Sequence, residues 1–176
     1  MTPKAYLTDT CPDAAELRAL LTEFYTHMFI RLTSIGGPLL DAADYARDSV
    51  ATIDQSLPPH GALALVRDAT GALIGCGSMR RLDATRGEMK RLYVAPAARG
   101  LGLGRALVQL RLDTARAMGL RSLYADTMRG NSGMLTLYDS FGFRAIDRYE
   151  GNANPVEYDR YLVYRRLDLG AKYWGI

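Results

Sequence analysis

The chain has 176 residues, of which 48% are hydrophobic and 23% are charged, a composition typical of a globular protein. Its length allows one hydrophobic core of ordinary size, so we expect residues 1–176 to form a single domain. The formal net charge of +3, from 22 Lys+Arg and 19 Asp+Glu, is too small and too dispersed to indicate nucleic-acid binding.

The first third of the chain predicts a short strand and two helices. We expect the strand at residues 5–8, and Thr10 and Asp13 form a candidate capping pair for the first helix. Residues 35–38 read Ile-Gly-Gly-Pro and interrupt the pattern before a second helix that begins at about Ala42. The apolar stripe of the first helix consists of Leu17, Leu20, Leu21, Phe24 and Met28.

Three strands are expected in the middle of the chain. Residues 62–67 and 73–80 are rich in apolar residues, and the turn sequence Asp-Ala-Thr-Gly at 68–71 joins them as a hairpin. A second turn, at 82–86, leads into residues 88–94, where branched and aromatic residues alternate as they do in a strand.

A glycine-rich run, Arg99 to Arg105, separates this last strand from an amphipathic helix. Alternate glycines let the main chain approach a ligand closely, and the free N–H groups at the start of a helix favour a phosphate. Gly119 is the expected end of the helix. Its predicted apolar face consists of Leu103, Ala106, Leu107, Leu110, Thr114 and Ala117.

The C-terminal third predicts alternating strands and helices. We expect a strand at 122–127, a short helix at 132–141 and two closing strands at 143–149 and 161–167. Residues 152–159, between the closing strands, are polar and rich in turn formers, so this segment is expected to be exposed.

Few residues could form a metal site or a disulfide. Cys11 and Cys76 are isolated in the sequence, and His27 and His60 are the only histidines, so no metal is expected. We see no signal sequence and no apolar run long enough to span a membrane, so the expected location is cytoplasmic.

Two nucleotide-binding motifs compete for the glycine-rich run. A P-loop requires a lysine and a hydroxyl residue after its last glycine, but Arg105 and Ala106 follow Gly104. The dinucleotide pattern Gly-x-Gly-x-x-Gly would place its last glycine at Arg105 or Leu107. Asp126 nevertheless lies at about the right distance for a ribose-binding carboxylate, so a nucleotide-binding protein stays an alternative.

Four motifs occur in one order from residue 89 to residue 143. They are Val-Ala-Pro at 94–96, Arg-Gly-Leu-Gly-Leu-Gly at 99–104, Asn131, and Leu-Tyr-Asp-Ser-Phe-Gly-Phe at 137–143. This part of the chain resembles the GCN5-related N-acetyltransferase (GNAT) superfamily. The resemblance implies an α/β (α+β) fold with a central mixed sheet flanked by helices on both faces.

The resemblance also implies acetyl-CoA as co-substrate. In the family, acetyl-CoA lies where the strand before the glycine loop separates from the next parallel strand. One backbone N–H near Leu92–Val94 is then expected to polarise the thioester carbonyl. The main chain of this strand and of the loop, together with Asn131, gives these expected cofactor-binding residues: Leu92, Tyr93, Val94, Arg99, Gly100, Leu101, Gly102, Leu103, Gly104, Arg105 and Asn131. As an alternative, Asn131 caps the helix that follows it.

Two catalytic residues follow from the family pattern, Tyr138 and Glu88. Tyr138 is expected to protonate the departing CoA thiolate, although it could instead be a core aromatic. Glu88 is the first candidate for the base that accepts the amine proton, and it shares a strand face with Leu92 and Val94 if no bulge intervenes. Asp126 is the second candidate, and a water chain is the third.

The expected function is acetyl transfer from acetyl-CoA to a primary amine of a small molecule, by direct attack in a ternary complex. The alternatives are a protein or peptide N-acetyltransferase and a non-catalytic acyl-CoA-binding module. In the family, the segments equivalent to 24–38 and 152–161 build the acceptor pocket. Family relatives often form homodimers.

Overall fold

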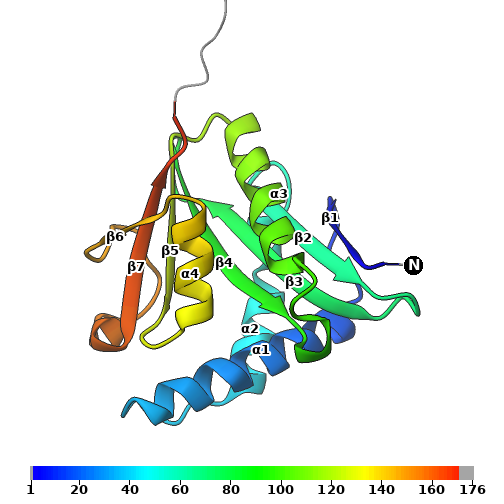
Figure 1. The fold of residues 1–176 in the computed structure, drawn as a ribbon, viewed down its shortest axis with the longest axis horizontal. Coiled ribbons are helices and arrows are strands. Elements are labelled where there is room, and N and C mark those ends of the chain that lie inside the picture. Colours follow the sequence, from blue (N-terminus) through cyan, green and yellow to red (C-terminus); the bar gives the residue numbers. More distant parts are fainter. Residues whose placement is uncertain (1, 171–176) are drawn as a thin grey trace, which may run out of the picture.

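A computed structural model describes residues 2–170, which form one seven-stranded sheet with helices on both faces (Figure 1). The strand order is β1-β2-β3-β4-β5-β7-β6. β4 and β5 run parallel, and every other neighbouring pair is antiparallel. The strands are β1 (Lys4–Thr8), β2 (Gly61–Arg67), β3 (Leu73–Arg81), β4 (Arg86–Val94), β5 (Ser122–Met128), β6 (Arg144–Ile146) and β7 (Leu162–Asp168).

Alternate residues of β2 show how the two faces of the sheet are covered. Leu63 and Leu65 pack with Leu17 of α1 on one face, whereas Ala64 and Leu107 of α3 belong to the core on the other face. The expected mixed sheet with helices on both faces is confirmed. The helices are α1 (Ala14–Ser34), α2 (Ala42–Ala51), α3 (Leu103–Ala117) and α4 (Ser132–Ser140), with 3₁₀ turns η1 (Ile53–Ser56), η2 (Pro96–Ala98) and η3 (Val156–Tyr161).

The start of α1 differs from the sequence prediction. Asp13 caps the helix alone, because its carboxylate accepts the N–H of Glu16 at 2.9 Å. The carbonyl of Thr10 instead accepts the hydroxyl of Thr8, so the expected capping pair is wrong. The buried face of α1 also continues to Phe29 and Leu32, further along the helix than the predicted stripe.

The buried face of α3 was only partly predicted. Leu103 and Leu107 lie in the core as expected, but the face continues through Arg111, which a hydrophobic pattern places in solvent. The other buried members are Val108, Leu112 and Ala115. Gly119 follows the helix with a positive φ of 75°, which confirms it as the end of α3.

The C-terminal segments differ most from the prediction. The strand expected at 143–149 is regular only over β6, because the chain then turns inward and buries Tyr149. Residues 152–159 are not uniformly exposed either, since Asn152 and Asn154 are half-buried and donate to Asp126. Within residues 2–170, no helix is both long enough and apolar enough to cross a bilayer.

Candidate active site

β4 and β5 separate halfway along their length. Their parallel pairing ends at Met89 and Ala125, although β5 stays paired with β7 as far as Met128. Residues 90–94 of β4 therefore have no strand partner on the β5 side. The separation expected from the family resemblance is present at this position.

A β-bulge interrupts β4 in the separated part. Cys76 of β3 pairs with Tyr93, and Ser78 pairs with Lys90, so β4 has one residue more than β3 between these pairs. Arg91, in the bulge, has a φ of +53°, and it is the only non-glycine residue with a positive φ in the described part of the chain. The bulge reverses the alternation of side chains along the strand.

This reversal corrects the expectation that Glu88 shares a face with Leu92 and Val94. Leu92 packs in the core beside α3, whereas Tyr93 packs in the core beside α1. Glu88 is fully buried and does not line the cavity described below. Its carboxylate pairs with Arg80 at 2.6 Å.

Arg111 fixes the geometry of the bulge from beneath the sheet. Its guanidinium is fully buried and donates to the carbonyls of Leu107 (2.9 Å), Ser78 (2.9 Å) and Lys90 (3.4 Å). Nη2 has no hydrogen-bond partner, and burial lowers the pKa of Arg111 to about 10. Gly77 makes room for the guanidinium, because a Cβ there would lie 2.8 Å from Cζ. Sequence reasoning missed Arg111; a glycine inside a strand was its only signal.

The glycine loop enters α3 in the conformation that its glycines predict. Gly100 and Gly102 have φ values of +81° and +75°, and Gly102 is the N-cap of the helix. A Cβ at either position would meet nothing within 4 Å, so the loop faces open space. Arg99 donates to the carbonyl of Val94 at 3.0 Å and so ties the loop back to β4.

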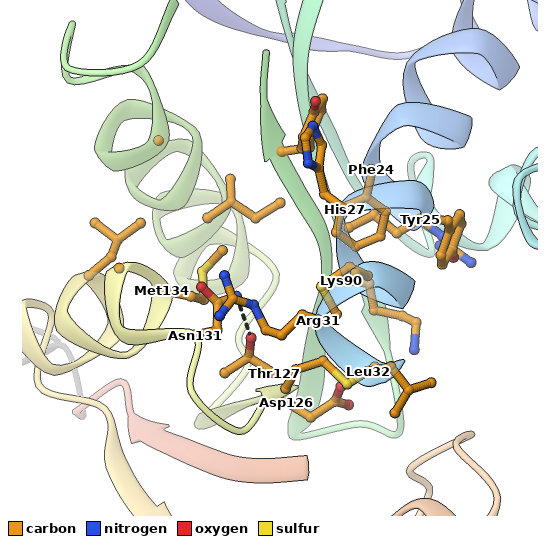
Figure 2. A pocket seen from close by; sticks show the side chains of 18 of the residues that line it. Phe24, Tyr25, His27, Arg31, Leu32, Lys90, Asp126, Thr127, Asn131 and Met134 are labelled. Carbon is orange, nitrogen blue, oxygen red and sulfur yellow. Dashed lines mark hydrogen bonds between the residues drawn. The ribbon is translucent and has the colours of Figure 1, made fainter. Parts of the chain in front are cut away.

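One cavity of about 1130 Å³ joins the loop, the separated strands and the helices (Figure 2). Of the expected cofactor-binding residues, only Leu101 does not line it, because its side chain is exposed to solvent. Those that do line it are Leu92, Tyr93, Val94, Arg99, Gly100, Gly102, Leu103, Gly104, Arg105 and Asn131.

Asn131, which precedes α4, and Tyr138 of α4 both line the cavity. The Asn131 side chain donates to the hydroxyl of Thr127 at 2.9 Å (Figure 2). Asn131 is the N-cap residue of α4, as the alternative expected, but its side chain makes no capping hydrogen bond. Tyr138 packs on Phe143 with ring centroids 5.0 Å apart. Burial raises the pKa of Tyr138 to about 12, and the charge of Arg111 opposes this shift.

Asp126 is the only carboxylate among the described residues that line the cavity. Its Oδ2 accepts hydrogen bonds from Asn152 at 2.8 Å and Asn154 at 3.1 Å. Burial raises its pKa, Glu88 adds to the shift, and the charge of Lys90 opposes it.

Tyr149 connects the two candidate bases. Its hydroxyl donates to Oε1 of Glu88 at 2.7 Å and lies 3.4 Å from Oδ2 of Asp126. Lys90 completes the cluster, with Nζ 3.5 Å from Oε2 of Glu88. Sequence reasoning missed Tyr149, Asn152 and Asn154, because these residues are distant from Asp126 in the sequence and contact it only in the folded chain.

The described residues include no group of three or more His, Cys, Asp or Glu side chains that could hold a metal ion. The glycine loop and the free part of β4 offer main-chain groups along an open cavity, and this arrangement fits a ligand with an extended arm and phosphates.

Comparison with known proteins identifies the family of this chain. The model of the acetyltransferase (GNAT) family matches residues 15–143, and the chain therefore belongs to that family. An uncharacterised N-acetyltransferase of Schizosaccharomyces pombe is 36% identical over 113 residues, which are 64% of this chain and 66% of that protein. The L-methionine sulfoximine/L-methionine sulfone acetyltransferase of Pseudomonas paraeruginosa is 33% identical over 85 residues, or 46% and 49% of the two chains. The matched part is thus less than two thirds of either relative's length.

A solved structure supports the fold. A candidate acetyltransferase from Salmonella typhimurium, solved with its cofactor acetyl-CoA, superposes with a TM-score of 0.65 at 23% identity. The superposition covers 98% of this chain and 97% of that one.

Proposed function

We propose that residues 1–176 form one catalytic domain that transfers the acetyl group of acetyl-CoA to a primary amine of a small molecule. The observation that carries this proposal is the cavity at the separation of β4 from β5. It brings free main-chain groups, a glycine loop, a phenol and a carboxylate to one space.

The main chain of Leu92, Tyr93 and Val94 would pair with the pantetheine arm, in the place of the missing strand partner. One backbone N–H there would polarise the thioester carbonyl. The loop from Arg99 to Arg105 would hold the pyrophosphate at the N-terminus of α3. Acetyl-CoA supplies the activated acyl group.

Tyr138 and Asp126 would divide the proton transfers. An ammonium acceptor must lose one proton before its nitrogen attacks, and a second once the N–C bond has formed and the C–S bond has broken. Tyr138, a neutral phenol whose pKa is raised to about 12, would protonate the thiolate and be reprotonated by one of these protons. The other would leave through Asp126, the carboxylate that lines the cavity.

Glu88, the first candidate base of the sequence analysis, has a different role in this proposal. Its carboxylate is held by Arg80 and Tyr149 away from the cavity, so it would act as a positioning residue. Through Tyr149 it would fix the carboxylate of Asp126 and add negative charge beside it.

A small-molecule acceptor has support from the relatives. The Pseudomonas paraeruginosa protein is named for two amino-acid derivatives. The cavity opens between α1, η3 and the turn before it, which are the segments expected to build the acceptor pocket.

A thermal-shift titration with acetyl-CoA, CoA, NAD and ATP tests the proposal. At about 100 times the dissociation constant, acetyl-CoA should add roughly 2.7 kcal/mol of stability, CoA should also stabilise, and NAD and ATP should not. The matched variants are Gly102→Ala and Gly71→Ala, because both glycines have positive φ and open space around them. Only Gly102 lines the cavity, so only the Gly102→Ala variant should lose the stabilisation by acetyl-CoA. A shift with NAD or ATP alone would contradict the proposal.

A further inference from the structure

Aromatic side chains surround the end of the cavity formed by α1, α2 and η3. Ring centroids lie 5.6 Å apart for Tyr25 and Phe29, 5.5 Å for Tyr25 and Tyr45, and 4.9 Å for Phe29 and Tyr45. Tyr158 and Tyr161 line the same cavity from η3. We call these five residues the aromatic chamber. Figure 2 shows Tyr25 on the α1 side of the cavity, opposite Asn131 and Met134 of α4.

Two of the four tyrosine hydroxyls in the chamber are hydrogen-bonded within the protein. The hydroxyl of Tyr25 is hydrogen-bonded to Ser49 at 2.7 Å, and that of Tyr161 donates to the carbonyl of Gly36 at 3.0 Å. The Tyr45 hydroxyl is uncharged at neutral pH, and burial raises its pKa further. A surface of this kind binds an aromatic or aliphatic body through buried apolar area and ring contacts.

The chamber adjoins the candidate base. Met128, two residues after Asp126 on β5, packs in the same core cluster as Phe29 and Tyr161. Asn154, which donates to Asp126, also lines the cavity. A ligand whose body fills the chamber can therefore place an amine beside Asp126.

The charges around this end of the cavity disfavour a ligand with more than one positive charge. Asp126 is the one carboxylate among the described lining residues, while Arg31 and Lys90 are cations on the same surface. Arg31 of α1 donates to the carbonyl of Gly130 at 2.8 Å. A second ammonium on the ligand would meet no carboxylate, and an unpaired buried charge is costly.

From these contacts we propose that the acceptor is a primary monoamine with an aromatic or similarly bulky apolar body. The body occupies the aromatic chamber, and the amine lies beside Asp126. This inference rests on the proposed acetyl transfer and uses the same step: the amine nitrogen bonds to the acetyl carbon, the C–S bond breaks, and the sulfur takes a proton from Tyr138.

The test compares three amines by initial rates of CoA thiol release. 2-Phenylethylamine should give a kcat/KM at least about tenfold above that of propylamine, which lacks the ring, and above that of the polycation spermidine. Tyr45→Ala should lower the ratio of phenylethylamine to propylamine about tenfold, chiefly through KM. Tyr6→Ala is the matched control, because Tyr6 (39% exposed) and Tyr45 (37% exposed) are similarly accessible and Tyr6 does not line the cavity.

Equal or better rates with propylamine or spermidine would overturn the proposal, as would a ratio that Tyr45→Ala leaves unchanged. If no amine releases thiol although acetyl-CoA binds, the proposed transfer fails, and calorimetry then tests the chamber separately. 2-Phenylethylamine should bind the CoA complex more tightly than propylamine, and Tyr45→Ala should weaken this binding. Absence of such binding would also overturn the proposal that the aromatic chamber binds the body of the amine.

Discussion

The guanidinium of Arg111 occupies the space that a side chain at position 77 would need, since a Cβ on Gly77 would lie 2.8 Å from its Cζ. This contact joins α3 to β3 directly opposite the bulge of β4. Arg111 also donates to carbonyls of β3 and β4, those of Ser78 and Lys90, so one buried side chain holds the two strands where β4 leaves β5.

Gly77→Ala should therefore destabilise the protein and weaken acetyl-CoA binding together. The added methyl group must displace a packed guanidinium, which costs about 1–3 kcal/mol in a close-packed core. Denaturant unfolding measures this cost. Gly133→Ala is the control for the unfolding measurement alone, because a Cβ there meets nothing within 4 Å and its position is helical, whereas its place in the cavity lining makes it unsuitable as a binding control. A Gly77→Ala protein as stable as the wild type would contradict the role given to this contact.

Arg111→Met should raise the dissociation constant of acetyl-CoA about tenfold, because the bulge loses two of the hydrogen bonds that hold it. Isothermal titration calorimetry measures the constant, and circular dichroism confirms that the variant is folded. Arg116→Met removes a partly exposed arginine from the same helix and should leave binding unchanged. Equal binding by both variants would show that Arg111 does not position β4.

Local sequence patterns predicted most of the strands, turns and helix ends, because these depend on neighbouring residues, whereas the sheet topology was expected from the family resemblance. Features of this kind, set by neighbouring residues, are the hairpin of β2 and β3, the glycine loop and the end of α3 at Gly119. The burial of Arg111 is not set by its neighbours in the sequence, since it depends on a glycine of β3 and on carbonyls of two strands. The shortening of β6 likewise depends on Tyr149 reaching Glu88 across 61 residues.

Tyr138→Phe should lower kcat by about 100-fold or more and leave the affinity for acetyl-CoA nearly unchanged. The phenylalanine keeps the packing against Phe143 and removes only the proton donor. Rates of thiol release and a binding titration measure the two effects separately. Turnover at the wild-type rate would rule Tyr138 out as the acid and favour its alternative as a core aromatic.

The acidic limb of the pH–rate profile should belong to Asp126. Burial raises the pKa of this carboxyl, so activity should rise with pH through a midpoint above the ordinary range of an aspartate. Asp126→Asn should cut kcat by about 100-fold and remove this limb. Glu88→Gln is the matched control and should keep a limb that moves to lower pH, because Glu88 helps to raise the pKa of Asp126. A limb that survives Asp126→Asn would assign the base to another group.

The same residue gives a prediction about stability. A carboxyl whose pKa is higher in the folded protein than in the unfolded chain favours folding when it is protonated, so stability is lost as the pH rises through the folded pKa. Asp126→Asn removes this loss and can still accept hydrogen bonds from Asn152 and Asn154. Its Tm at neutral pH should equal or exceed that of the wild type, and a clearly lower Tm would contradict the assignment.

The proposal of Asp126 in place of Glu88 as the base rests on the structure. Strand alternation alone places Glu88 on the face of Leu92, and one extra residue at Arg91 reverses that alternation. A bulge of this kind is set by contacts across the sheet and beneath it, which a single sequence does not reveal.

We propose acetyl transfer to an amine in the cavity between β4 and β5. Its most direct test is to measure the rate of CoA thiol release with and without 2-phenylethylamine, and to quantify the acetylated amine by mass spectrometry. We expect release to depend on the amine and to match the product one for one. Tight acetyl-CoA binding with no acetylated product from this or any other primary amine would instead indicate a non-catalytic acyl-CoA-binding protein.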